Sequence, residues 1–111
     1  MTHDGSCHCG TIRIAIDGDP VDAAECNCSI CRRTGALWTY CSPSRAQVTG
    51  SGLGYVQGDA MLTLWHCATC GVVTHWTPRD PAYDRMGINL RLFDPAVWTA
   101  LPRRLVDGAS W

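Results

Sequence analysis

The chain has 111 residues, a mass of 12.1 kDa and a formal net charge of −1, enough for one domain and too little for two ordinary cores. All nine basic residues are Arg, and their near balance with ten acidic residues argues against nucleic acid as a partner, because binding polyanions requires concentrated positive charge. The absence of Lys excludes a Schiff-base or P-loop lysine. We therefore expect a single domain over residues 1–111 whose chemistry depends on its eight cysteines.

Short strands are predicted along most of the chain. Residues 11–16 alternate, with Ile12, Ile14 and Ile16 on one face, as in a half-buried strand. Further runs rich in β-branched and aromatic residues predict strands at residues 37–41, 55–57, 62–65, 72–76 and 87–92. Asp94 and Pro95 predict the start of a short helix that ends before Pro102. The pattern indicates an all-β domain of short antiparallel sheets with a short C-terminal helical segment.

The cellular compartment decides how the cysteines are interpreted. No apolar run approaches the ~20 residues needed to cross a bilayer, and the first residues lack a secretory signal. We expect a soluble, cytoplasmic protein without membrane contact. Most of the cysteines are spaced as CxC or CxxC, which is too close for ordinary disulfides but suits ligands of one ion. A metal role is favoured over a disulfide scaffold or purely redox thiols.

Two cysteine pairs far apart in the sequence predict a structural zinc site. Cys7 and Cys9 form a CxC motif, and Cys67 and Cys70 form a CxxC motif followed by Gly71, as in a zinc knuckle. Four thiolates would complete a tetrahedral site with no open position. Such a site would tie residue 9 to residue 67 across most of the chain, and its loss should unfold the protein.

The cluster Cys26, Cys28 and Cys31 lies within six residues and predicts a second zinc site of another kind. Three thiolates can hold one face of a zinc ion and leave its fourth position open for a ligand, as in catalytic zinc sites. Alternatively, a fourth protein ligand closes the site; the candidates are Cys41, His66, His75 and Asp84. Cys41 itself has no second ligand beside it and is predicted to be a small core residue, and His3 is expected in an N-terminal tail.

These motifs resemble one known family. Four segments, residues 5–13, 26–36, 67–71 and 88–94, carry the ordered CxC, CxCxxC and CxxCG combination and are similar to the domain shared by glutathione-dependent formaldehyde-activating enzymes and centromere protein V. The resemblance covers about residues 5–95 and departs at Asn27, where relatives often have His. It implies a β-tent fold with a structural zinc on the four paired cysteines and a second zinc on the cluster.

The resemblance also implies an activity: a carbon–sulfur lyase that reversibly condenses formaldehyde with glutathione. The second zinc would activate a thiol for addition to a small aldehyde, with Cys26, Cys28 and Cys31 holding the catalytic metal. Arg32 and Arg33 follow the cluster and could bind the carboxylates of glutathione. The alternatives are a non-catalytic zinc domain that binds a protein partner and a zinc protein resembling methionine sulfoxide reductase, with Cys41 as its redox thiol.

Overall fold

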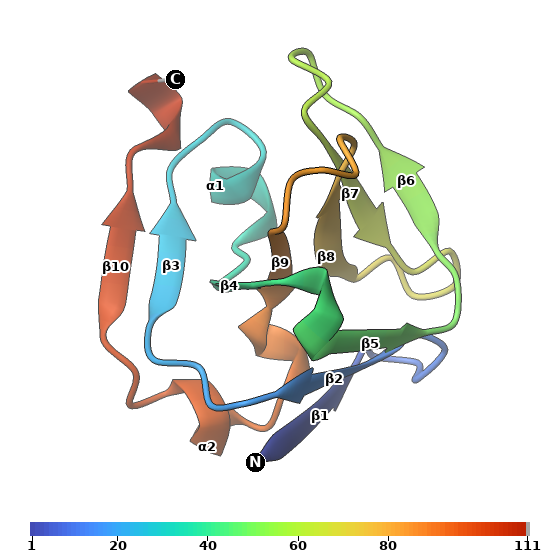
Figure 1. The fold of residues 1–111 in the computed structure, drawn as a ribbon, viewed down its shortest axis with the longest axis vertical. Coiled ribbons are helices and arrows are strands. Elements are labelled where there is room, and N and C mark those ends of the chain that lie inside the picture. The colour runs from blue at the N-terminus through green and yellow to red at the C-terminus, as the bar shows by residue number, and fades with distance from the viewer. Residues whose placement is uncertain (111) are drawn as a thin grey trace.

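The smaller sheet forms around the alternating isoleucines. In the computed structural model, which describes residues 1–110, β2 (Arg13–Asp17) lies between β1 (Thr2–Ser6) and β5 (Ala46–Thr49), and both pairings are antiparallel (Figure 1). The isoleucine face of β2 is buried. His3, expected in a tail, belongs to β1, and its Nε2 lies 2.7 Å from Asp19 Oδ1. The expectation of a tail was wrong because β2 offers a free edge for pairing.

The larger sheet has seven strands in the order β10-β3-β4-β9-β8-β7-β6. Most form where the sequence predicts strands, with ends shifted by up to three residues. Their bounds are β3 (Ala23–Cys26), β4 (Trp38–Cys41), β6 (Leu53–Tyr55), β7 (Leu62–His66), β8 (Val73–Pro78), β9 (Met86–Asn89) and β10 (Arg103–Val106). All neighbours are antiparallel except β10 and β3, which run parallel. This pair corrects the expectation of purely antiparallel sheets, and the long connection between the two strands makes it possible.

Helical structure is limited to single turns. Asp94 caps α2 (Pro95–Trp98) by accepting a 2.9 Å hydrogen bond from the Ala96 N–H, which confirms the predicted C-terminal helical segment. The other helix is α1 (Cys31–Thr34), and 3₁₀ turns occupy Pro43–Arg45, Leu90–Leu92 and Gly108–Ser110. Among residues 1–110, none of the helices has the length and apolar character needed to cross a bilayer.

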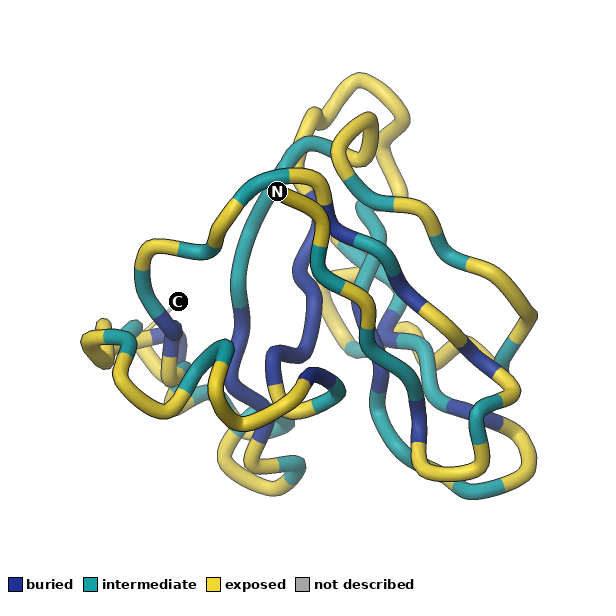
Figure 2. The backbone as a smooth tube through the Cα atoms, turned by 90° about the horizontal axis from the view of Figure 1, so that it is seen from below, coloured by how far each residue is buried: buried dark blue, intermediate teal, exposed yellow. Residues whose placement is uncertain are grey.

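Two separate cores lie on opposite faces of the larger sheet. The first fills the space between the two sheets, where the isoleucines of β2 meet Leu37, Ile88 and Phe93. The second covers the other face and centres on Trp38 and Leu64. Figure 2 shows the buried positions concentrated on the inner strands while the connecting loops are exposed. Each core packs against a different group of cysteines.

Candidate metal centres

Cys7, Cys9, Cys67 and Cys70 come together from distant parts of the chain, after β1 and after β7. Their Sγ atoms all lie within 4.8 Å of one another, with 3.7 Å between Cys7 and Cys9 and 3.6 Å between Cys9 and Cys67. A tetrahedron built on Zn–S bonds of ~2.3 Å has edges of ~3.8 Å between sulfurs. The spacing of this donor set therefore fits one zinc ion.

Two similar turns present these thiols. The Cys7 N–H donates to Ile12 O and the Cys67 N–H to Val72 O, each at 3.0 Å. Gly71 has φ of +79°, a left-handed conformation that glycine adopts without strain. This is the role that the CxxCG motif predicts for it. The two loops thus form a pair of knuckles facing each other.

Backbone N–H groups of the knuckles point at the sulfurs. The Ile12 N–H donates to Cys7 Sγ at 3.3 Å and the Thr69 N–H to Cys67 Sγ at 3.4 Å. Cys7 and Cys67 are also almost completely buried in the core between the sheets. Hydrogen bonds to sulfur stabilise the thiolate that a metal requires. This group therefore has the features of a closed structural site.

Hydrogen bonds lower the pKa of each of the two outer thiols, Cys9 and Cys70. Backbone hydrogen bonds involving Val72 and Cys9 lower the pKa of Cys70 to about 6. The hydrogen bond with the Thr11 side chain lowers the pKa of Cys9. Deprotonated thiols are the ligands that zinc needs, so the lowered pKa values of Cys9 and Cys70 favour metal binding, whereas the pKa of Cys67 is raised.

The second group, Cys26, Cys28 and Cys31, lies where β3 ends and α1 begins. The three Sγ atoms lie within 4.8 Å of one another, and within residues 1–110 no fourth His, Cys, Asp or Glu joins them. All three residues are only partly buried. The protein thus supplies three ligands and leaves one side of the group without a protein ligand.

The four candidate closing ligands lie elsewhere. Cys41 packs against the core on the opposite face of the larger sheet, and burial raises its pKa. His75 is buried beside Trp65, and burial lowers its pKa to about 4. Asp84 accepts a hydrogen bond from Ser42. His66 lies in β7 and, like the other three, is not part of the cysteine group.

Hydrogen bonds differentiate the three clustered thiols. Burial raises the pKa of Cys31, although the Trp38 Nε1–H donates to its Sγ at 3.4 Å. At Cys28 burial acts in the same direction but is outweighed by hydrogen bonds from the backbone N–H groups of Cys31 and Ile30, so its pKa is lowered. The hydrogen bonds therefore favour the thiolate form of Cys28 more than that of Cys31.

The C-terminal segment forms a wall of this group, a feature that the sequence analysis missed. Asn27 Nδ2 donates to Asp107 Oδ1, and the Ala109 N–H donates to Asn27 Oδ1, both at 2.9 Å. Gly108, between Asp107 and Ala109 in the chain, lies so close to the cysteine group that a Cβ added to it would be 2.6 Å from Cys26 Sγ. Only glycine fits this contact. In the sequence, Gly108 was the only sign of this close contact, and it belongs to no recognisable motif.

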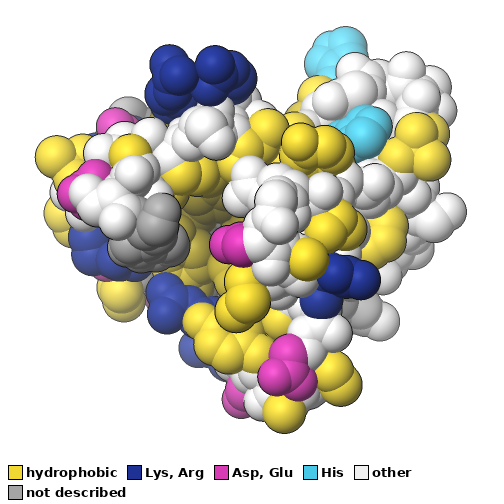
Figure 3. All heavy atoms as spheres, turned by 90° about the horizontal axis from the view of Figure 1, so that it is seen from above, with side chains coloured by type: hydrophobic (Ala, Val, Ile, Leu, Met, Phe, Trp, Pro, Cys, Tyr) yellow, Lys and Arg dark blue, Asp and Glu magenta, His cyan; other side chains and the backbone are white. Residues whose placement is uncertain are grey.

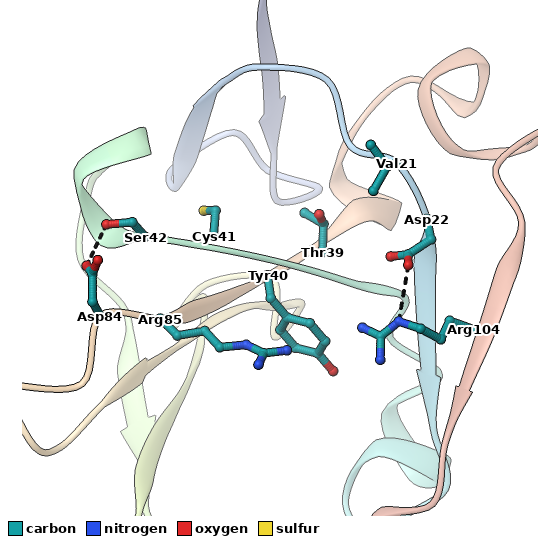
Figure 4. Close-up of a pocket in the computed structure, with 9 residues that line it drawn as sticks. All are labelled: Val21, Asp22, Thr39, Tyr40, Cys41, Ser42, Asp84, Arg85 and Arg104. Atoms are coloured by element: carbon teal, nitrogen blue, oxygen red, sulfur yellow. Dashed lines mark hydrogen bonds and ion pairs between the residues drawn. The ribbon is translucent and has the colours of Figure 1, made fainter.

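The arginines nearest the cluster in sequence are not those that line a cavity. Arg32 and Arg33 are exposed on α1, and Arg33 Nη1 donates to Ser29 O at 2.7 Å. A pocket of about 330 Å³ lies instead around Tyr40 and is lined by Arg85 and Arg104 (Figure 4). Figure 3, viewed from the end of the molecule where α1 lies, shows a hollow with mainly hydrophobic walls and arginines around it.

Comparison with known proteins gives a family match and a similar solved structure. Residues 2–103 match the family described as glutathione-dependent formaldehyde-activating enzyme. A crystal structure of a Rhodobacter sphaeroides protein is similar, with a TM-score of 0.74 and 29% sequence identity over 91% of this chain and 99% of that chain. No curated protein matches the sequence. The family match and the two groups of unpaired cysteines agree with the resemblance and with the preference for metal ligands over disulfides.

Proposed function

Since the chain belongs to the glutathione-dependent formaldehyde-activating enzyme family, we propose that it is a zinc-dependent carbon–sulfur lyase that adds a thiol reversibly to a small aldehyde. The observation that carries this proposal is the group Cys26, Cys28 and Cys31, which has three thiols and no fourth protein ligand within residues 1–110. Three protein ligands with an open position are the arrangement of catalytic rather than structural zinc. We propose that residues 1–111 work as one cytoplasmic domain.

The reaction balances without a further reactant. The sulfur of the thiol forms a bond to the aldehyde carbon, the carbon–oxygen π bond breaks, and the thiol proton passes to the oxygen. Zinc bound at the three cysteines would stabilise the thiolate form of the incoming thiol near neutral pH. With formaldehyde and glutathione the product is S-hydroxymethylglutathione.

The residues around the cluster have separate tasks in this proposal. Cys26, Cys28 and Cys31 hold the metal and do not act as nucleophiles. The Trp38 indole, 3.4 Å from Cys31 Sγ, holds that sulfur in place and forms an apolar wall. Asn27 and Gly108 keep the C-terminal segment against the cluster. Together the indole and the C-terminal segment form two walls of the group.

The test is thiol-dependent consumption of formaldehyde, measured above the protein-free background. We expect the zinc-loaded wild type to accelerate adduct formation with glutathione, and Cys28→Ser to lose that acceleration while keeping its circular dichroism spectrum. Arg79→Gln is the control, because it changes an exposed side chain that hydrogen-bonds to Ala60 O and belongs to neither cysteine group. A Cys28→Ser rate equal to that of wild type would exclude catalysis at this site.

The same assay separates the proposal from a non-catalytic zinc domain. Such a domain would hold both metals and give no rate above background with any thiol. Loss of activity in Cys41→Ser but not in Cys28→Ser would instead favour redox chemistry at Cys41. The raised pKa of Cys41 argues against that outcome, because a thiol is a weak nucleophile until it is deprotonated.

A further inference from the structure

We propose that Arg85 and Arg104, placed around Tyr40, bind a carboxylate of the thiol substrate. This inference rests on the proposed function and names the class of thiol that the site accepts: one that carries a carboxylate, rather than a neutral or cationic thiol. Its basis is the pocket of about 330 Å³ at the point where β3 and β4 separate.

Two guanidinium groups converge on the Tyr40 ring. The Cζ atom of Arg85 lies 4.3 Å and that of Arg104 5.6 Å from the ring centroid. Figure 4 shows Tyr40 between them, with the side chains coming from opposite sides of the pocket. Guanidinium groups on an aromatic face are held in place while their edges stay available for hydrogen bonds to an anion.

Arg85 is the cation without an acidic partner. Within residues 1–110 no carboxylate oxygen lies within 4.0 Å of it. The neighbouring Asp84 is turned away and accepts a hydrogen bond of 2.5 Å from the Ser42 hydroxyl. Arg104, by contrast, is paired with Asp22 at 3.1 Å. A carboxylate entering the pocket would give Arg85 its first anionic partner and could also approach Arg104.

The sheet register places this pocket next to the three-cysteine group. Arg104 is two residues before Val106, which is the register partner of Cys26, so the two positions are ~7 Å apart along the strand. Side chains two residues apart share one face of a sheet. Tyr40 and Trp38 are related in the same way on β4, and the Trp38 indole contacts Cys31.

That spacing fits one molecule reaching both places. A thiol directed at the cysteine group and a carboxylate directed at Arg85 would be separated by about the length of one or two residues of extended peptide. Mercapto acids and short cysteine peptides, glutathione among them, have this form. Cysteamine has the thiol without the carboxylate and would find no partner in the pocket.

The test measures binding independently of catalysis. S-Methylglutathione, whose sulfur cannot form a thiolate, is titrated by calorimetry into the zinc-loaded protein. We expect Arg85→Gln to weaken binding about tenfold or more, as for the loss of a charged hydrogen bond, and Arg85→Lys to weaken it less. Arg79→Gln is the control, because it removes the same charge from an exposed residue whose side chain hydrogen-bonds to Ala60 O.

A second arm identifies the group that is recognised. The diethyl ester of S-methylglutathione should bind weakly to wild type and equally weakly to Arg85→Gln. The proposal is overturned if Arg85→Gln binds S-methylglutathione as tightly as wild type does, if Arg32→Gln or Arg33→Gln carries the loss instead, or if only inorganic phosphate binds in an Arg85-dependent way. Circular dichroism of each variant verifies its fold.

Failure of the proposed function gives a different pattern. If the protein does not accelerate formaldehyde addition but S-methylglutathione still binds through Arg85, the carboxylate site is correctly assigned and the proposed reaction is wrong. If the reaction proceeds and Arg85→Gln leaves KM for glutathione unchanged, the reaction is right and the pocket is wrong. With both correct, Arg85→Gln raises KM for glutathione about tenfold or more and leaves that for cysteamine unchanged.

Discussion

The two groups of cysteines use the same ligand chemistry in opposite surroundings. Cys7 and Cys67 are almost fully buried between the sheets, and backbone N–H groups donate to their sulfurs. Cys26, Cys28 and Cys31 are partly buried on the far face of the larger sheet. The first group has four thiols and the second has three. Under the proposed function, this difference separates a site that holds the chain together from a site that is free to react.

Removing a ligand from the four-cysteine group should have the largest effect. Cys67→Ser breaks a closed site that joins the knuckles after β1 and β7. Structural zinc contributes ~10–16 kcal/mol of apparent binding free energy in small peptides, compared with a total of ~5–15 kcal/mol for a typical domain. We expect Cys67→Ser to be unfolded at 25 °C by circular dichroism.

Cys28→Ser is the matched substitution in the other group, and we expect it to remain folded. A folded Cys67→Ser variant would show that the two groups do not differ in structural importance. Metal analysis of both variants identifies which site each has lost.

The sequence was sufficient to predict the cysteine groups, because the short spacing within each motif already brings the thiols close together. Two residues within three positions on a tight turn must point to one place, so Cys67 and Cys70 could be paired without a structure. The strand over residues 13–17 could also be predicted, since alternating isoleucines leave one face to bury. The strands β10 and β1 could not be predicted, because their residues show no apolar alternation. They become strands only by pairing with β3 and β2.

The surroundings of the three-cysteine group depend on contacts between distant segments. The sequence points to Arg32 and Arg33 because they follow the cluster directly, whereas the register of β10 brings Arg104 to the pocket. The Asn27 contacts to Asp107 and Ala109 join residues 80 and 82 positions apart in the chain. No local pattern records such contacts, and for this reason the sequence predicted ligands better than it predicted the walls around them.

We expect acid to lower the free energy of unfolding through the protonation of His75, which is buried in the fold. Its register partner is Ile88 in the core between the sheets, and burial lowers its pKa to about 4 from 6.5. The unfolded chain therefore binds the proton more readily, so stability is complete above pH 6.5 and decreases as the pH falls towards 4. We expect a loss of about 2 kcal/mol between pH 7 and pH 5.

His75→Phe should lack this component, and urea unfolding of both proteins at the two pH values measures it. Metal loss in acid affects wild type and variant alike, so their difference isolates the histidine. Equal pH dependence in the two proteins would mean that His75 is not protonated preferentially in the unfolded chain.

Gly108→Ala should change the open site alone. The added methyl group would lie 2.6 Å from Cys26 Sγ and 3.0 Å from Cys28 Cβ, so either the C-terminal segment or the thiol must move. We expect the zinc affinity of the three-cysteine group to fall about tenfold, the equivalent of ~1.4 kcal/mol, in a chelator competition. Gly58→Ala is the control, because a Cβ there would meet no atom within 4 Å. An unchanged affinity in Gly108→Ala would show that the segment is not a wall of this site.

The most direct test of the difference between the two groups is stepwise zinc removal, with zinc release and circular dichroism recorded on one sample. The wild type should contain two zinc ions, and a chelator should remove the first without loss of structure and the second only with unfolding. Cys28→Ser should lack the first step and keep the second. Release of both ions in one unfolding step, or persistence of the early step in Cys28→Ser, would contradict the assignment of an open site to Cys26, Cys28 and Cys31.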